Sequence, residues 1–122
     1  PLLFSAHHAA TACWRDVAHV EANRDLYRQI YAIADDVFGN APGYMAPEAG
    51  FFLWLDVGAG EDAALKLWRE TGVRALPGGY LSRDVAPELG GGNPGTGYLR
   101  RALVAPAEDV RRGLEAVREV VL

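Results

Sequence analysis

The sequence predicts an α+β fold, a small two-layer α/β sandwich in which a short, mostly antiparallel sheet is covered by helices and preceded by a long helix. Three observations lead to this prediction. Residues 8–38 contain no glycine or proline and repeat apolar side chains at helical spacing. Residues 51–57 are almost continuously apolar and aromatic, whereas residues 98–104 alternate across a pleat and precede a final amphipathic segment.

The first expected element is the helix over residues 8–38. An unbroken helix of this extent would be about 45 Å long, which is more than a compact domain of this size needs. Such a helix usually links two bodies, although the pattern also fits two abutting helices. We therefore expect a single domain over residues 1–122, with a long linking helix at 8–38 and the sandwich at 50–122.

Glycine and proline at Gly39–Gly43 end this helix. The apolar run Phe51–Val57 is typical of a strand covered on both faces, and we expect it to be the central strand. Residues 61–71 begin with acids, carry basic residues later and are followed by Gly72, a charge order that favours a helix. Leu65 and Trp68 are expected to face the core.

Two short segments follow this helix. Val73–Leu76 is expected to form a strand that Pro77–Gly79 ends and that Tyr80–Ser82 can resume. Residues 84–97 hold five glycines and two prolines, a composition that predicts a loop.

Residues 98–104 form the next expected strand, and Pro106 opens the last helix. The alternation sends Tyr98, Arg100, Ala102 and Val104 to one face and Leu99, Arg101 and Leu103 to the other. The apolar stripe of the last helix consists of Val110, Leu114, Val117 and Val121.

Composition excludes several classes of function. A net charge of -4 and a pI near 5.3 argue against a nucleic-acid or anionic-membrane partner, and no apolar run is long enough to cross a bilayer. The single cysteine, Cys13, excludes an internal disulfide framework, and the cytoplasm is the expected location. The chain starts at Pro1 without the features of a signal peptide, so we expect it to begin within a longer protein.

Several residue patterns could carry chemistry but are better explained structurally. Gly90–Gly95 matches the G-x-G-x-x-G pattern of dinucleotide-binding loops, yet it precedes a strand and Pro94 lacks a backbone donor, so a flexible loop is expected. The histidines, His7, His8 and His19, lack a metal-ligand spacing and are expected to be surface or packing residues.

Cys13 and Lys66 are also interpreted structurally. Cys13 is expected to be a small buried hydrophobe on the first helix. Lys66 is the only lysine and so the only side-chain amine that could form a Schiff base, but its helical position favours a solvated residue that contributes charge near the helix end.

Arg100 is the most informative candidate. A guanidinium on a strand presents a planar fork that can bind a carboxylate through two parallel hydrogen bonds. Arg101 points to the opposite face. From the residues alone, a structural salt bridge or an edge-strand charge is the more common role for either arginine.

Three segments in register resemble the carboxy-terminal small domain of class I/II aminotransferases, which have the aspartate-aminotransferase fold, or fold type I. The segments are Gly50–Leu55, Leu67–Gly78 and Gly97–Val104, and the upstream helix with Trp14–Asp16 resembles the interdomain helix of that family. The combination of residues 76–81, 93–95 and 98–100 is most similar to the N-succinyldiaminopimelate aminotransferases of lysine biosynthesis.

The resemblance implies a division of roles between this chain and a larger domain that is expected to lie outside it. The arginine of the Y-x-R strand in this family binds the α-carboxylate of the substrate and corresponds to Arg100. The family's pyridoxal-phosphate residues have no counterpart here, so we expect no catalytic, cofactor-binding or metal-binding residue in this chain and no cofactor bound to it alone.

The sequence therefore predicts part of a pyridoxal-phosphate-dependent aminotransferase that acts on an amino acid and a 2-oxo acid, inactive by itself and homodimeric when complete. The alternative is a non-catalytic α/β module that binds a small molecule or a protein. The absence of a catalytic constellation supports that alternative.

Overall fold

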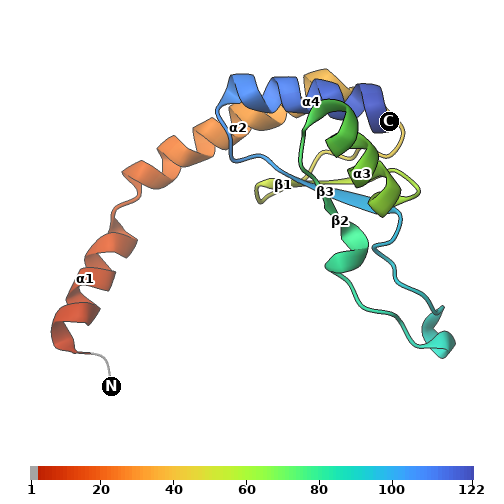
Figure 1. Cartoon of the computed structure of the whole chain (residues 1–122). Coiled ribbons are helices and arrows are strands. Elements are labelled where there is room, and N and C mark those ends of the chain that lie inside the picture. Colours follow the sequence, from red (N-terminus) through yellow and green to blue (C-terminus); the bar gives the residue numbers. More distant parts are fainter. Residues whose placement is uncertain (1–2) are drawn as a thin grey trace.

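The computed structural model describes residues 3–122 and has the predicted α+β architecture, a three-stranded antiparallel sheet covered by helices (Figure 1). Pro1 and Leu2, which carry the expectation of a start within a longer protein, lie outside the described residues. The elements are α1 (Phe4–Arg15), α2 (Ala18–Phe38), β1 (Phe52–Asp56), α3 (Gly60–Thr71), β2 (Leu76–Pro77), β3 (Tyr98–Ala102) and α4 (Ala107–Val121), with the 3₁₀ turns η1 (Gly78–Tyr80) and η2 (Pro87–Leu89).

The strand order is β1-β3-β2, and both pairings are antiparallel. The central strand is therefore β3, and the prediction that Phe51–Val57 forms the central strand is wrong. This segment is an edge strand whose Leu53 and Leu55 are fully buried while Trp54 is 45% exposed. The prediction failed because β1 carries large aromatic side chains on its second face as well, and such a run usually indicates a strand covered on both sides. Here no helix of the described chain covers that second face.

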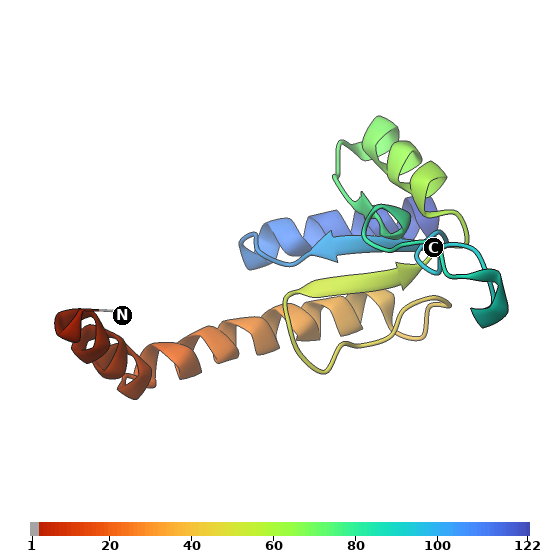
Figure 2. The same ribbon diagram turned by 90° about the horizontal axis from the view of Figure 1, so that it is seen from below.

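Helices α2, α3 and α4 lie together on one face of the sheet, which makes two layers (Figure 2). The core between the layers consists of Ala34, Val37, Phe38, Leu53, Leu55, Leu67, Leu99, Leu103, Val110, Leu114 and Val117. Three of the four residues of the predicted α4 stripe are in this core, and the fourth, Val121, packs against it. The helical period of α4 and the alternation of β3 are thus confirmed.

Helix α3 packs through a different side than expected. Leu65 and Trp68 are 45% and 48% exposed, so the prediction that they face the core is wrong. The helix instead buries Leu67 and half-buries Ala63 and Ala64. Small alanines let α3 approach its neighbours closely, which leaves its larger apolar side chains on the outer side.

Residues 73–82 are only partly extended. β2 is limited to Leu76–Pro77, so the predicted strand Val73–Leu76 is wrong over most of its length. Tyr80–Ser82 does not resume the strand, because Gly78–Tyr80 form a 3₁₀ turn directly after β2. Residues 84–97 form the predicted loop, interrupted only by η2.

The predicted long helix consists of two helices separated at Asp16 and Val17. The carboxylate of Asp16 accepts a hydrogen bond from the backbone N–H of Ala18 at 3.3 Å and lies 3.4 Å from Nδ1 of His19. An aspartate that accepts a hydrogen bond from the backbone two residues later competes with the helical hydrogen bonds and favours a break at this point.

Helix α1 and the first half of α2 project away from the sandwich (Figure 1). No residue of α1 is buried, and Trp14 is 86% exposed. The expectation that Cys13 is buried is therefore wrong, because α1 projects from the sandwich (Figure 1) and buries none of its residues. The histidines His7, His8 and His19 are exposed, in agreement with the predicted surface role. None of the helices formed by residues 3–122 is long and apolar enough to span a membrane.

Candidate functional site

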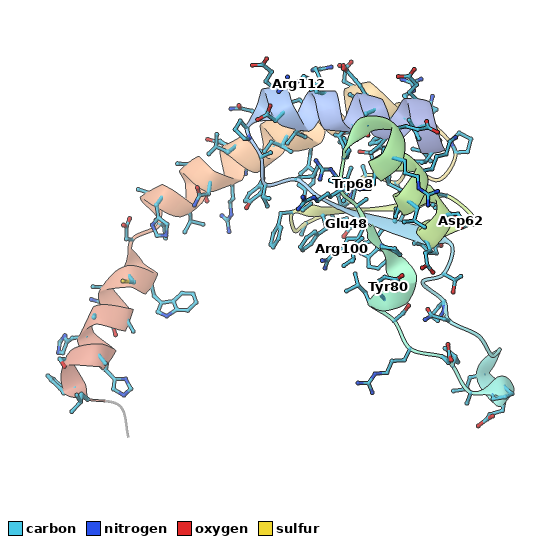
Figure 3. All side chains as sticks on the ribbon, in the orientation of Figure 1. Glu48, Asp62, Trp68, Tyr80, Arg100 and Arg112 are labelled. Atoms are coloured by element: carbon cyan, nitrogen blue, oxygen red, sulfur yellow. The ribbon has the colours of Figure 1, made fainter. Side chains whose placement is uncertain are left out.

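The sheet has a second face, turned away from the three packed helices, and we call it the open sheet face. Alternate residues of β1 and β3 point to this face because directly paired residues of neighbouring strands share a side. Its members are Phe52, Trp54 and Asp56 of β1, Tyr98, Arg100 and Ala102 of β3, and Leu76 of β2, which pairs directly with Arg100. Figure 3 shows Arg100 on the side of the sheet away from α4.

Arg100 is half-buried, and its guanidinium leans along the sheet toward β1. It pairs across the strands with Trp54, and its diagonal neighbours on the open sheet face are Phe52 and Asp56. The guanidinium carbon lies 4.3 Å from the centroid of the Phe52 ring. Among the described residues, Arg100 forms no ion pair with an acid. The structure therefore places a positive charge on an aromatic surface without a carboxylate partner from this part of the chain.

Arg101 has a different environment on the opposite face. Its Nη1 donates a hydrogen bond to the carbonyl oxygen of Arg74 at 2.9 Å, and burial lowers the pKa of its guanidinium. Helix α4 has a glycine at this point, and a Cβ on Gly113 would lie 3.1 Å from Nη2 of Arg101. Arg101 thus ties the segment between α3 and β2 to the sheet beneath α4, which is a structural role. Of the two neighbouring arginines, Arg100 is the one available to a ligand.

Two glycines bring the turn after β2 against the loop before β3, next to Trp54. A Cβ on Gly78 would lie 2.6 Å from the carbonyl oxygen of Gly95 and 2.7 Å from Cζ3 of Trp54. No side chain fits at that distance, so the L-P-G-G-Y and N-P-G segments depend on each other through this contact. The Trp54 ring also packs edge-on against Tyr98, with the ring centroids 6.1 Å apart.

Asn93 holds the same contact with hydrogen bonds. Its Nδ2 donates to the carbonyl oxygen of Gly79 at 2.9 Å, and its Oδ1 accepts the backbone N–H of Gly95 at 3.0 Å and the hydroxyl of Ser82. The Ser82 hydroxyl lies 3.1 Å from the carbonyl oxygen of Gly78. The side chain of Asn93 therefore links the turn after β2 to the loop before β3, both of which flank the site. The same hydrogen bonds close the turn that directly follows the short strand Leu76–Pro77.

We expect Gly78→Ala to lower the free energy of unfolding by about 1–3 kcal/mol, because the added methyl group has to displace Trp54 or the Gly95 backbone. Urea unfolding followed by tryptophan fluorescence measures this loss. Gly79→Ala is the matched control, since its Cβ would meet no atom closer than 3.6 Å. Equal stability of the two variants would show that the Gly78–Gly95 contact does not constrain the site.

The remaining sequence candidates do not converge on the open sheet face. Lys66 is exposed, and its Nζ donates a hydrogen bond to the carbonyl oxygen of Val120 at 2.8 Å, at the end of α4. The glycines 90–92 lie in the loop and adopt positive φ angles, a conformation that favours glycine. Within residues 3–122, no three histidine, cysteine, aspartate or glutamate side chains lie close enough together to hold a metal ion.

The sequence does not predict the aromatic residues around Arg100. Phe52 and Trp54 share its face of the sheet, but the apolar run that contains them predicts a strand covered on both faces. The alternation of β3 could have identified them. A strand paired with β3 also alternates between the two faces, so every second residue of Phe51–Val57 has to share the face of Arg100. The sequence indicates the Gly78–Gly95 contact less clearly. Its only indication is that a glycine-rich segment follows β2 and another precedes β3, the strand with which β2 pairs.

Comparisons with known proteins agree with the fold. No family model matches the chain. An LL-diaminopimelate aminotransferase of Syntrophobacter fumaroxidans is 35% identical over 77 residues, which cover 61% of this chain and 17% of that protein. The crystal structure of an aminotransferase from Neisseria meningitidis superposes with a TM-score of 0.82 at 33% identity, over 91% of this chain and 28% of that one.

A second solved structure, from Silicibacter pomeroyi, has a TM-score of 0.53 at 20% identity and supports the fold alone. The chain thus spans less than a third of the length of each of these three proteins. Over the matched part, the chain is similar in sequence to the Syntrophobacter fumaroxidans and Neisseria meningitidis aminotransferases and shares the fold of the Neisseria meningitidis structure.

Proposed function

We propose that this chain is the small-domain part of a pyridoxal-phosphate-dependent aminotransferase and that Arg100 binds the substrate's α-carboxylate. The reaction exchanges the amino group of an amino acid for the keto oxygen of a 2-oxo acid, so both substrates and both products carry a carboxylate beside the reacting carbon. A group that binds this carboxylate serves both halves of the reaction. Homology to aminotransferases supports the class of reaction.

The observation that carries the proposal is the unpaired guanidinium of Arg100 on the open sheet face. A guanidinium fork binds a carboxylate in plane through two charge-assisted hydrogen bonds. The Phe52 ring reduces the water around this charge, which strengthens its attraction for a carboxylate. Holding the substrate at one end also orients the bonds at its α-carbon.

The described residues do not fit a pyridoxal-phosphate site. The cofactor needs an amine for its covalent attachment and donors for its phosphate, and the only lysine is engaged with Val120 at the end of α4. We therefore assign the cofactor, which supplies the electron sink of transamination, to a larger domain outside these residues. The same assignment makes the isolated chain inactive and leaves homodimer formation to the complete enzyme.

For the substrate we propose a diaminopimelate-type amino acid, with the N-succinyl form as the preferred amino donor. The resemblance of residues 76–81, 93–95 and 98–100 supports the N-succinyl form, while the match to an LL-diaminopimelate aminotransferase supports the wider class. Lysine biosynthesis in the cytoplasm is the corresponding role.

The test is an amino-transfer assay of the complete protein with pyridoxal phosphate. N-Succinyl-LL-diaminopimelate, LL-diaminopimelate and common amino acids serve as donors, each against a panel of 2-oxo acids. We expect the N-succinyl donor to have the highest kcat/KM. Highest activity with free LL-diaminopimelate would overturn the subtype, and no transfer from any donor would overturn the aminotransferase proposal.

Lys66→Ala should leave kcat and KM of the complete protein within about twofold of the wild type, because Lys66 lies on the outer surface of α3. Loss of its exposed hydrogen bond should lower the free energy of unfolding by about 1 kcal/mol or less. The amino-transfer assay and urea unfolding measure the two effects. A loss of activity of more than about a hundredfold would mean that Lys66 takes part in the chemistry.

A further inference from the structure

We infer that Phe52 is a positioning residue for Arg100 and sets the affinity of the carboxylate site. The inference rests on the proposed function of Arg100. The guanidinium carbon of Arg100 lies 4.3 Å from the centroid of the Phe52 ring, within the range in which a ring face attracts a cation. No acid of the described chain competes with the ring for this charge, so the contact fixes the orientation of the fork while leaving its edge free for a ligand carboxylate.

The pairing of the strands explains why Arg100 leans over this ring. Phe52 faces Ala102 directly across the pair, and Arg100 lies two residues earlier on β3. The small side chain of Ala102 leaves the face of the Phe52 ring uncovered, which gives the guanidinium room to lie over it. The other diagonal neighbour, Asp56, lies on the opposite side of Arg100, so the side chain, which lies over Phe52, leans away from the acid that β1 carries on the open sheet face.

Phe52 is itself held in place by other aromatic rings. Its centroid lies 4.3 Å from that of Phe51, which in turn stacks on Tyr27 of α2 at 6.4 Å. This row of rings connects the arginine to the helix that leaves the sandwich. Because neighbouring rings already restrict the Phe52 side chain, it loses little conformational entropy when the guanidinium packs on it. The ring can therefore hold the guanidinium in one orientation.

The test uses the complete protein and a double-mutant cycle between Phe52 and Arg100. Phe52→Leu removes the ring face but keeps an apolar side chain, and we expect KM for the amino donor to rise roughly three- to tenfold with kcat changed less than twofold. Phe52→Trp keeps a ring face and should restore KM to within about twofold. In an Arg100→Ala background, Phe52→Leu should cause no further rise, because the ring then has no cation to position.

A second variant approaches the same contact from the other strand. Ala102→Leu fills the space above an intact Phe52 ring, and we expect it to raise KM by a similar factor. Trp68→Leu is the matched control, since Trp68 lies under a different guanidinium, that of Arg74, at 5.0 Å on the outer side of α3. It should leave KM unchanged.

The outcomes separate this inference from the proposed function. A raised KM in Arg100→Ala together with a wild-type KM in Phe52→Leu would overturn the role of Phe52 and leave that of Arg100 standing. Independent, multiplying effects of the two substitutions would also overturn it. A wild-type KM in Arg100→Ala would overturn the proposed function and the positioning role with it.

Discussion

Arg100→Ala in the complete protein should lower kcat/KM for amino-acid donors by about two to three orders of magnitude. The variant loses two charge-assisted hydrogen bonds to the substrate carboxylate, each contributing about 1.5–3 kcal/mol, with part of that loss offset by water in the enlarged site. Most of the loss should appear in KM, because the carboxylate is bound before and during the reaction. Steady-state kinetics with the preferred donor measure both constants.

A matched pair of ligands makes this prediction specific to the carboxylate. The wild type should bind an amino acid far more tightly than the amine that lacks only its α-carboxylate, and Arg100→Ala should lose most of that difference. Arg112→Ala is the control, since Arg112 lies on the outer side of α4 and pairs with Asp109 (Figure 3). Unchanged discrimination in Arg100→Ala would exclude the guanidinium as the carboxylate ligand.

Leu99→Ala should lower the free energy of unfolding by about 2–5 kcal/mol, the range for truncation of a fully buried leucine. Leu99 lies at the middle of the sheet, where it pairs with Leu55 on one side and Pro77 on the other. The cavity would therefore open where both strand pairs and the helices meet, and few atoms could move to fill it. Urea unfolding gives the midpoint and the slope from which this free energy is obtained.

Leu89→Ala provides the comparison for that measurement. Leu89 is 77% exposed in the loop, so its truncation should change stability by no more than about 0.5 kcal/mol. The loss of stability in Leu99→Met should lie between those of Leu99→Ala and Leu89→Ala, because methionine has nearly the same side-chain volume as leucine. If Leu99→Ala were as mild as Leu89→Ala, the central position of β3 would be wrong.

The predictions from sequence were most accurate where one local rule decided the structure. The acids that start α3 and Gly72 that ends it set that helix correctly. The alternation of leucine and arginine in β3 correctly assigned both faces of the strand, and with them the opposite sides on which Arg100 and Arg101 lie.

The predictions failed where the answer depended on what covers a surface. Phe52 and Trp54 look like core residues by composition, and their partial exposure follows from the position of the helices on the other face. Likewise Cys13 and Trp14 are apolar but lie on α1, a helix with no buried residue. The contact of Arg100 with Phe52 could not be read from spacing, because it needs the register that pairs Phe52 with Ala102.

The alternation of β3 also has a consequence for errors in assembly. A slip of one residue against its neighbours would send the charged Arg100 into the core and expel Leu99 from it. Burial of an unpaired guanidinium costs more free energy than new contacts on the open sheet face could offset. The hydrophobic core therefore selects the one register in which Leu99 is buried and Arg100 lies on the open sheet face.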